Sequence, residues 1–221
     1  MTAVEFAQQM PQLRFLPALQ LIRLAEQANI STLAKKQSFH ATLLPNAPCV
    51  YLLEGGAIIQ PSMGGQGTPV PQLALGQAWL NLSTSLCNST TTYLVQAFTP
   101  ARIMAIPRSV LLNAARKNPD LAFHLAEVCA CETQAVLRWH QAMLSKSVEG
   151  RTAFLLARLH RQSAHGDTLA LPLGQTQLAQ LIGCSREVLS RALTSLVRKG
   201  HIIRHGASIS VLSPEDLEQI P

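Results

Sequence analysis

The chain has 221 residues, of which 48% are hydrophobic and only 14% charged, a composition that excludes a disordered chain and favours a folded protein with a sizeable core. The net charge of +6 is concentrated in residues 138–205, which hold ten Lys or Arg side chains and three acidic ones. Such a positive segment favours a phosphate backbone as partner, although a solvated basic face would have the same composition.

The N-terminal residues predict a helix and no targeting segment. Residues 1–10 lack the basic start and apolar core of a signal peptide, and no apolar run of the chain has membrane-spanning length. We therefore expect a cytoplasmic protein without a membrane partner. Apolar positions at helical spacing predict a helix within residues 13–27, which Pro17 interrupts early.

The next part of the chain predicts a small β-domain. Across residues 38–107, short apolar runs alternate with turn residues such as Gly55-Gly56. Many short strands at this spacing are typical of a β-barrel or β-roll. Residues 108–117 predict a short helix that follows it.

A long helix is predicted from Pro119 to about Ser145, with the Asp120 carboxylate in its first turn. One stripe of this helix follows coiled-coil spacing and predicts a partly polar dimer seam: Ala122, Ala126, Cys129, Thr133, Val136, His140, Met143 and Ser147. A second stripe lies beside it and comprises Leu121, Leu125, Val128, Ala135 and Trp139. One stripe can pack on the β-domain and the other on a partner helix. Burial of both stripes within one subunit is the alternative.

After the long helix, residues 147–150 predict a hinge and residues 151–162 an amphipathic helix. Residues 163–168 predict a polar loop. These elements lead into residues 175–212, the segment that carries the functional prediction.

Residues 175–212 predict a winged helix-turn-helix. Thr176 is expected to cap a short helix that Gly183 ends with a positive φ, and Ser185 to cap a second helix. Lys199-Gly200 stops the second helix. Residues 202–211 then predict two short strands that turn at His205-Gly206, which form the wing.

The exposed face of the second helix predicts contact with DNA. Arg186, Glu187, Ser190 and Arg191 project from its N-terminal end, where the side chains of a recognition helix reach base edges in the major groove. A surface pair between Glu187 and Arg191, four residues apart, is a compatible alternative. Four further side chains are expected near phosphates: Thr176, Ser185, Lys199 and Arg204.

The sequence of this segment resembles the catabolite-activator/fumarate-nitrate regulator (CRP/FNR) superfamily of transcription regulators. The resemblance is carried by LAQLIGCSRE at 178–187, SRAL at 190–193 and LVRKG at 196–200. Outside these words, Gly55 resembles the family's roll glycine, and residues 148–151 its hinge-to-helix junction.

The resemblance implies an α+β fold in three parts. They are a cyclic-nucleotide-binding-like β-roll (1–118), a dimerisation helix and hinge (119–147) and a C-terminal winged helix-turn-helix (148–221). It also implies a homodimer with double-stranded DNA and RNA polymerase as partners. Within the recognition helix, Arg186, Glu187 and Arg191 match the family's base-reading positions, and Ser190 matches the extra contact of the fumarate-nitrate branch.

The effector positions do not match the cyclic-nucleotide binders of this family. Those proteins carry a Gly-Glu pair and, ten residues after the Glu, an Arg that neutralises the cyclic phosphate. With Gly76 setting the register, the corresponding residues are Leu80-Asn81 and Thr91-Thr92, and those that would meet the base are Val136-Leu137. We expect an effector that is not a cyclic nucleotide, or none, because a buried phosphate without a cation is costly.

Cofactors are not predicted either. The five cysteines (Cys49, Cys87, Cys129, Cys131 and Cys184) are odd in number and form no CxxC pair, so we expect reduced thiols and no metal site. An iron–sulfur branch would need clustered N-terminal cysteines. A haem or small-molecule effector stays an alternative; the candidate axial ligands are His40, His124, His140 and Cys87, none within a motif.

Three functions compete at this point. The first is a sequence-specific DNA-binding regulator that acts as a homodimer on a palindromic operator. The second is a small-molecule-binding β-roll whose helical C-terminal region only assembles oligomers. The third, a cupin-like enzyme, would need clustered ligands, whereas the β-region supplies only His40 and Glu54. The basic recognition face favours the first function, and we do not expect an enzyme.

Overall fold

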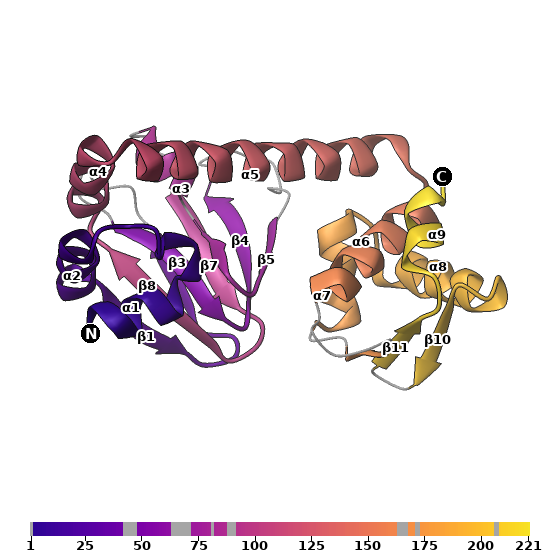
Figure 1. Ribbon diagram of the computed structural model, residues 1–221. Coiled ribbons are helices and arrows are strands. Elements are labelled where there is room, and N and C mark those ends of the chain that lie inside the picture. Colours follow the sequence, from indigo (N-terminus) through magenta and orange to yellow (C-terminus); the bar gives the residue numbers. More distant parts are fainter. Residues whose placement is uncertain are drawn as a thin grey trace. The chain divides into compact units, whose positions relative to one another are not determined.

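The computed structural model describes residues 2–41, 48–62, 72–80, 82–87, 92–162, 168–170, 173–205 and 208–221. Its contacts divide the chain into two compact units, residues 1–133 and 134–221. The predicted α+β class is confirmed, with antiparallel sheets in the first unit and a helix-turn-helix in the second (Figure 1). No described helix combines the length and the apolar character needed to cross a bilayer.

The first unit is a β-roll of two facing sheets, as predicted. One sheet joins β1 (Asn29–Leu33), β8 (Ala101–Ile106), β3 (Cys49–Glu54) and β6 (Ala78–Trp79) in that order. The other joins β2 (Ser38–Ala41), β7 (Thr92–Ala97), β4 (Gly56–Ser62) and β5 (Gln72–Leu75). The strand β1 precedes the predicted start of the β-region at Ser38, which was therefore placed too late.

Strand β3 is buried on both faces and separates two hydrophobic clusters. Its side chains alternate, as they must along a strand: Val50 and Leu52 point into the roll interior, whereas Cys49, Tyr51 and Leu53 face the helices. The turn that follows requires Gly55, whose φ is +89° and where a Cβ would lie 2.3 Å from the Pro100 carbonyl oxygen.

Helices cover one sheet of the roll. They are α1 (Ala3–Gln9), the 3-10 helix η1 (Pro11–Leu13), α2 (Ala18–Gln27), α3 (Leu82–Leu86) and α4 (Arg108–Lys117). The sequence predicted a helix within residues 13–27 that Pro17 interrupts early, and α2 indeed begins only at Ala18, with Pro17 as its N-cap. The reason is that proline has no N–H to donate, which is tolerated where a helix begins.

Helix α5 (Pro119–Ser145) confirms the predicted long helix. Asn118 caps it, since its side-chain oxygen accepts hydrogen bonds from the backbone N–H groups of Asp120 (3.0 Å) and Leu121 (3.2 Å). Leu121 and Leu125 are buried in the core of the first unit.

The second unit contains α6 (Val148–Gln162), α7 (Gln175–Ile182), α8 (Arg186–Arg198), α9 (Pro214–Gln219) and a small sheet. The sheet has the order β10 (Ile202–His205), β11 (Ser208–Val211) and β9 (Thr168–Ala170), all antiparallel. Strands β10 and β11 confirm the predicted wing; of its expected turn, Gly206 lies outside the described residues.

Two sequence predictions in this unit are wrong at their boundaries. Thr168 was expected in a polar loop, but it begins β9 and pairs with Ser210; residues 163–167 lie outside the described part. The predicted hinge at 147–150 is shorter, because α6 already begins at Val148. Its start is set by Ser147, whose hydroxyl accepts a hydrogen bond of 3.1 Å from the Gly150 N–H.

Candidate nucleic-acid interface

Two glycines bound helix α7: Gly174 precedes its first residue, and Gly183 ends it at the turn to α8. Helix α7 begins one residue before the predicted cap: Gly174 is its N-cap, and Thr176 lies exposed in its first turn, so the expected cap by Thr176 is wrong. The side-chain oxygen of Gln177 accepts a hydrogen bond of 3.3 Å from the Gly174 N–H, which fixes the start of α7 at this glycine. Gly183 ends α7 at φ +69°, and the Cys184 N–H donates to the Ala179 carbonyl at 3.0 Å.

Helix α8 buries one face against the rest of its unit. Ser185 caps it as predicted, accepting a 3.3 Å hydrogen bond from the Val188 N–H. The buried face consists of Leu189, Ala192, Leu193 and Leu196. On the opposite face, the predicted base-reading side chains are exposed or, for Ser190, half-buried.

These side chains line a groove on the surface of the second unit. The groove brings together all four predicted residues and adds four others: Gln175, Thr194, Ser195 and Arg198. Thr194 and Arg198 continue the four-residue spacing of Arg186 and Ser190 along α8, a signal that the sequence analysis did not extend. Gln175 comes from the start of α7, where no pattern of α8 could have indicated it.

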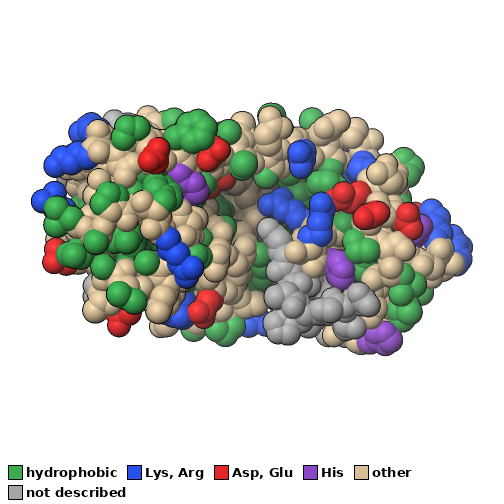
Figure 2. Space-filling view, viewed as in Figure 1, with side chains coloured by type: hydrophobic (Ala, Val, Ile, Leu, Met, Phe, Trp, Pro, Cys, Tyr) green, Lys and Arg blue, Asp and Glu red, His purple; other side chains and the backbone are tan. Residues whose placement is uncertain are grey.

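The charges of this groove suit a base-reading surface. The pKa of Glu187 lies below its usual value, first because its own backbone N–H donates to it and then because Ser185 does, with smaller effects of Arg186 and Arg191. Its carboxylate is thus an ionised acceptor among arginines. In the view of Figure 2, Lys and Arg side chains gather where α8 ends.

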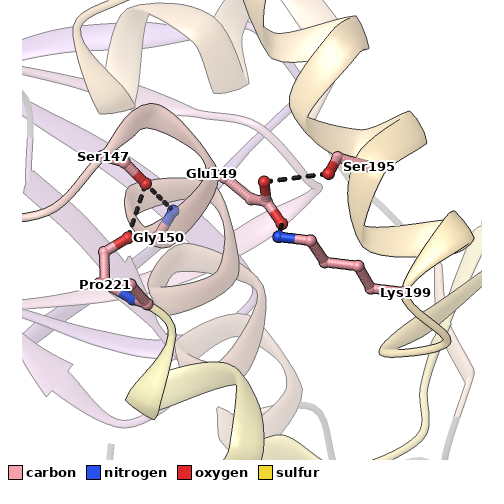
Figure 3. A network of polar contacts seen from close by, with 6 residues as sticks. All are labelled: Ser147, Glu149, Gly150, Ser195, Lys199 and Pro221. Carbon is pink, nitrogen blue, oxygen red and sulfur yellow. Dashed lines mark hydrogen bonds and ion pairs between the residues drawn. The ribbon is translucent and has the colours of Figure 1, made fainter.

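The expected phosphate neighbours differ in how free they are. Thr176 and Arg204 are exposed, and the Ser185 hydroxyl is engaged as a cap. Lys199 donates from Nζ to Glu149 Oε1 at 2.7 Å, and the other carboxylate oxygen of Glu149 accepts from the Ser195 hydroxyl at 3.0 Å (Figure 3). Lys199 is therefore already paired within the chain.

The expected effector residues are only partly described. Leu80 is buried in the roll interior, and its N–H donates to the Val50 carbonyl at 2.8 Å. Asn81 and Thr91 lie outside the described residues, as does the side chain of Thr92, which begins β7. Val136 is half-buried and Leu137 is 55% exposed.

The residues considered as haem ligands are spread over the chain. His40, His140 and Cys87 are exposed, whereas His124 is half-buried with its ring edge against Phe15. Within the described part of the chain, no three His, Cys, Asp or Glu side chains are placed to hold a metal ion.

The predicted dimer seam lies beside a more exposed apolar stripe. Thr133 and His140 are exposed, but Cys129, Val136 and Met143 are half-buried. The large apolar side chains most open to solvent on α5 are Phe123 (66%), Leu137 (55%) and Leu144 (87%). Together with Ala130, these three residues repeat every seven positions. Each lies one residue after a member of the predicted seam, so the exposed apolar face is turned around the helix by one residue relative to the prediction.

Comparisons with known proteins agree with this arrangement. Residues 150–220 match the family described as the Crp-like helix-turn-helix domain. The cAMP-activated global transcriptional regulator CRP of Pasteurella multocida is 28% identical over 120 residues, which cover 53% of this chain and 57% of the relative. CRP of Escherichia coli O157:H7 gives the same values. The chain thus spans little more than half the length of the curated relatives it matches.

Solved structures share the fold over most of the chain. FixK2 from Bradyrhizobium japonicum superposes with a TM-score of 0.72 at 19% identity, covering 87% of this chain and 96% of FixK2. A CRP/FNR-family transcriptional regulator from Thermus thermophilus gives a TM-score of 0.67 at 18% identity, with coverage of 86% and 97%. The order of β-roll, long helix and helix-turn-helix is therefore that of known structures.

Proposed function

We propose, from the chain's homology to the CRP/FNR transcription regulators and its Crp-like helix-turn-helix domain, that it is a sequence-specific DNA-binding regulator acting as a homodimer on a palindromic operator. The observation that carries this proposal is the groove on α8. There Arg186, Glu187, Ser190 and Arg191 face solvent together, while the opposite face of the helix is buried. An element that only assembled oligomers would have no use for such a surface.

The chemistry of the groove favours G·C base pairs. Arg186 and Arg191 can each donate two hydrogen bonds to O6 and N7 of a guanine. The ionised carboxylate of Glu187 can accept from the amino group of cytosine or orient a neighbouring arginine. Gln175, Thr194 and Arg198 extend the same surface and can contact further bases or phosphates.

The exposed stripe on α5 supports the homodimer. Phe123, Ala130, Leu137 and Leu144 form an unpaired apolar row at coiled-coil spacing, which a second copy of the helix would cover. A two-fold dimer presents two recognition helices, and this matches a palindromic operator. We place the protein in the cytoplasm with its DNA and propose RNA polymerase as a further partner.

We further propose an effector that is not a cyclic nucleotide, or no effector. The relative from Pasteurella multocida is named for activation by cAMP. Here Leu80 occupies the roll interior at the first position that resembles the nucleotide-binding pair, and Thr91 stands where an arginine would neutralise the phosphate. Calorimetric titration with cAMP and cGMP should detect no binding; micromolar binding that changes operator affinity would contradict this.

Random-site selection with the purified protein tests the main proposal. It should recover an inverted repeat with a G·C pair in each half-site, the halves about one helical turn apart. Replacing Arg186 or Arg191 by Ala should cost about 1–3 kcal/mol per half-site and relax base preference at one position. Arg138→Ala, a change outside the groove, is the control. Selection without any palindrome would refute the proposal.

A further inference from the structure

A carboxylate of α6 lies at the edge of the α8 groove. Glu149, in the first turn of α6, accepts one hydrogen bond from Ser195, which lines the groove, and one from Lys199, the residue that follows α8. Both contacts reach Glu149 from the C-terminal end of the recognition helix (Figure 3). The acid and the lysine are thus paired beside the surface that is proposed to bind DNA.

The pair is partly shielded from solvent and lies beside other hydrogen-bonded groups. The Glu149 side chain is 21% exposed and that of Lys199 49%. The backbone of Glu149 is fixed by its neighbours, because the Ser147 hydroxyl accepts from the Gly150 N–H and donates to the Pro221 carbonyl at 2.6 Å. Desolvation would raise the pKa of Glu149, but hydrogen bonds from Lys199 and Ser195 outweigh it and the pKa lies below its usual value.

We propose that Glu149 is a positioning residue that restrains Lys199, so that the lysine reaches a DNA phosphate only by leaving this carboxylate. The inference rests on the proposed function. A free lysine that meets a phosphate releases a counterion, which raises the affinity for any duplex. A lysine that is already neutralised exchanges one partly exposed ion pair for another, and such an exchange changes the free energy little.

The consequence is that Glu149 lowers sequence-independent binding. In the wild-type chain, Lys199 contributes less to DNA affinity than its position beside the groove suggests. Removal of the carboxylate charge should free Lys199 to contact a phosphate and so raise the affinity for DNA. The gain should be the same for specific and non-specific duplexes, because phosphate contacts carry no sequence information.

The test uses the full chain and the variants Glu149→Gln, Lys199→Gln and the double variant. Fluorescence anisotropy measures affinity for the selected operator and for an unrelated duplex over a range of salt concentrations. Glu149→Gln should bind both duplexes about five- to tenfold more tightly per subunit near 0.1 M salt, with a salt slope steeper by about 0.9 per subunit. In the Lys199→Gln background the same change should have no effect.

Asp216→Asn is the matched control. It removes one negative charge from the same unit at an exposed position of α9 that forms no ion pair within the described residues. It should leave affinity and salt slope unchanged. Thermal unfolding without DNA establishes that each variant is folded.

Three results would overturn the inference. If Glu149→Gln weakens binding or leaves it unchanged, the carboxylate braces α6 against α8 and does not restrain Lys199. If the gain persists in the Lys199→Gln background, Glu149 acts by general repulsion. If wild type binds no duplex at low salt, the proposed function fails and the inference with it, whereas wild-type binding with an inert Glu149 removes only the inference.

Discussion

At the scale of single residues, Gly150 is a position where backbone atoms of another segment leave no room for a side chain. It lies in the first turn of α6, and a Cβ there would be 2.3 Å from the Pro221 carbonyl oxygen and 2.8 Å from that of Ile220. These are backbone atoms, so the C-terminal segment itself would have to move. Alanine is normally favoured over glycine in a helix by about 1 kcal/mol. If Gly150→Ala lowers the stability instead, the steric clash with the C-terminal segment must be the cause.

We expect Gly150→Ala to lower the free energy of unfolding by about 1–3 kcal/mol, as overpacking does. Chemical denaturation checks this. The matched change Gly174→Ser, at an N-cap where a Cβ meets no atom within 4 Å, should be neutral or slightly stabilising. A Gly150→Ala variant as stable as wild type would show that the C-terminal segment does not pack here in solution.

Glu132 is the residue that should make stability depend on pH. Burial raises the pKa of its carboxyl from 4.5 to about 7. Between these values the folded chain binds more protons than the unfolded chain, so the free energy of unfolding falls as the pH rises through this window. Glu132 therefore contributes stability that is complete below pH 4.5 and is lost above about pH 7.

Glu132→Gln, which keeps the shape and removes the titration, isolates this contribution. Its Tm should match that of wild type near about pH 4 and exceed it near about pH 8, because the half-buried charge is absent. Calorimetric unfolding at both pH values gives the comparison. Parallel Tm curves for the two proteins would rule out a titrating Glu132.

At the scale of elements, α5 carries the surface that should hold the dimer. Leu137 lies in the middle of the exposed stripe, whereas Arg138, the next residue, projects about 100° away around the helix. Leu137→Lys would place a charge in the centre of an apolar interface. We expect it to shift the protein from dimer to monomer in sedimentation velocity, with Arg138→Glu remaining dimeric. A dimer that survives Leu137→Lys must be held by another surface.

The elements that sequence reasoning placed correctly are those with local signals. Gly183 and Ser185 fix the turn and the start of α8 from within a few residues, and both were predicted. The prediction that Thr176 caps α7 was wrong because Gly174 and Gln177, which are also close in sequence, start the helix one residue before Thr176. Strand β1 was not predicted because four of its five residues are exposed or half-buried, and their burial does not alternate regularly. Helix α9 was missed, although Pro214 and two acidic residues mark its first turn.

In the candidate site, too, the sequence predicted the residues that share one helix but not those that other helices contribute. The four residues proposed to read bases belong to one helix, so a helical pattern alone places them on one face. Gln175 joins them only through the packing of α7 against α8, and Glu149 meets Lys199 across 50 residues of chain. No spacing rule of a single element reaches these contacts, because they depend on how separate helices pack.

At the scale of the whole molecule, the two copies of α8 in the proposed dimer should act together. Binding of the second half-site becomes intramolecular once the first is bound, and such coupling commonly multiplies affinity by about 10² or more. The full palindrome should therefore bind at least about 100-fold more tightly than a duplex with one half-site scrambled. Competition binding measures the ratio. In Leu137→Lys the ratio should collapse towards one, and a wild-type ratio near one would contradict two-fold recognition.

The separation of the two faces of α8 bears on how such a protein changes over evolutionary time. The residues that hold the helix, such as Leu189 and Leu193, are different from those that line the groove, such as Arg186 and Arg191. Substitutions at the groove positions remove no core packing, so new operator preferences can arise without prior loss of stability. In the proposed regulator, substitutions in the groove can therefore change which operator is recognised while the buried face of α8 stays the same.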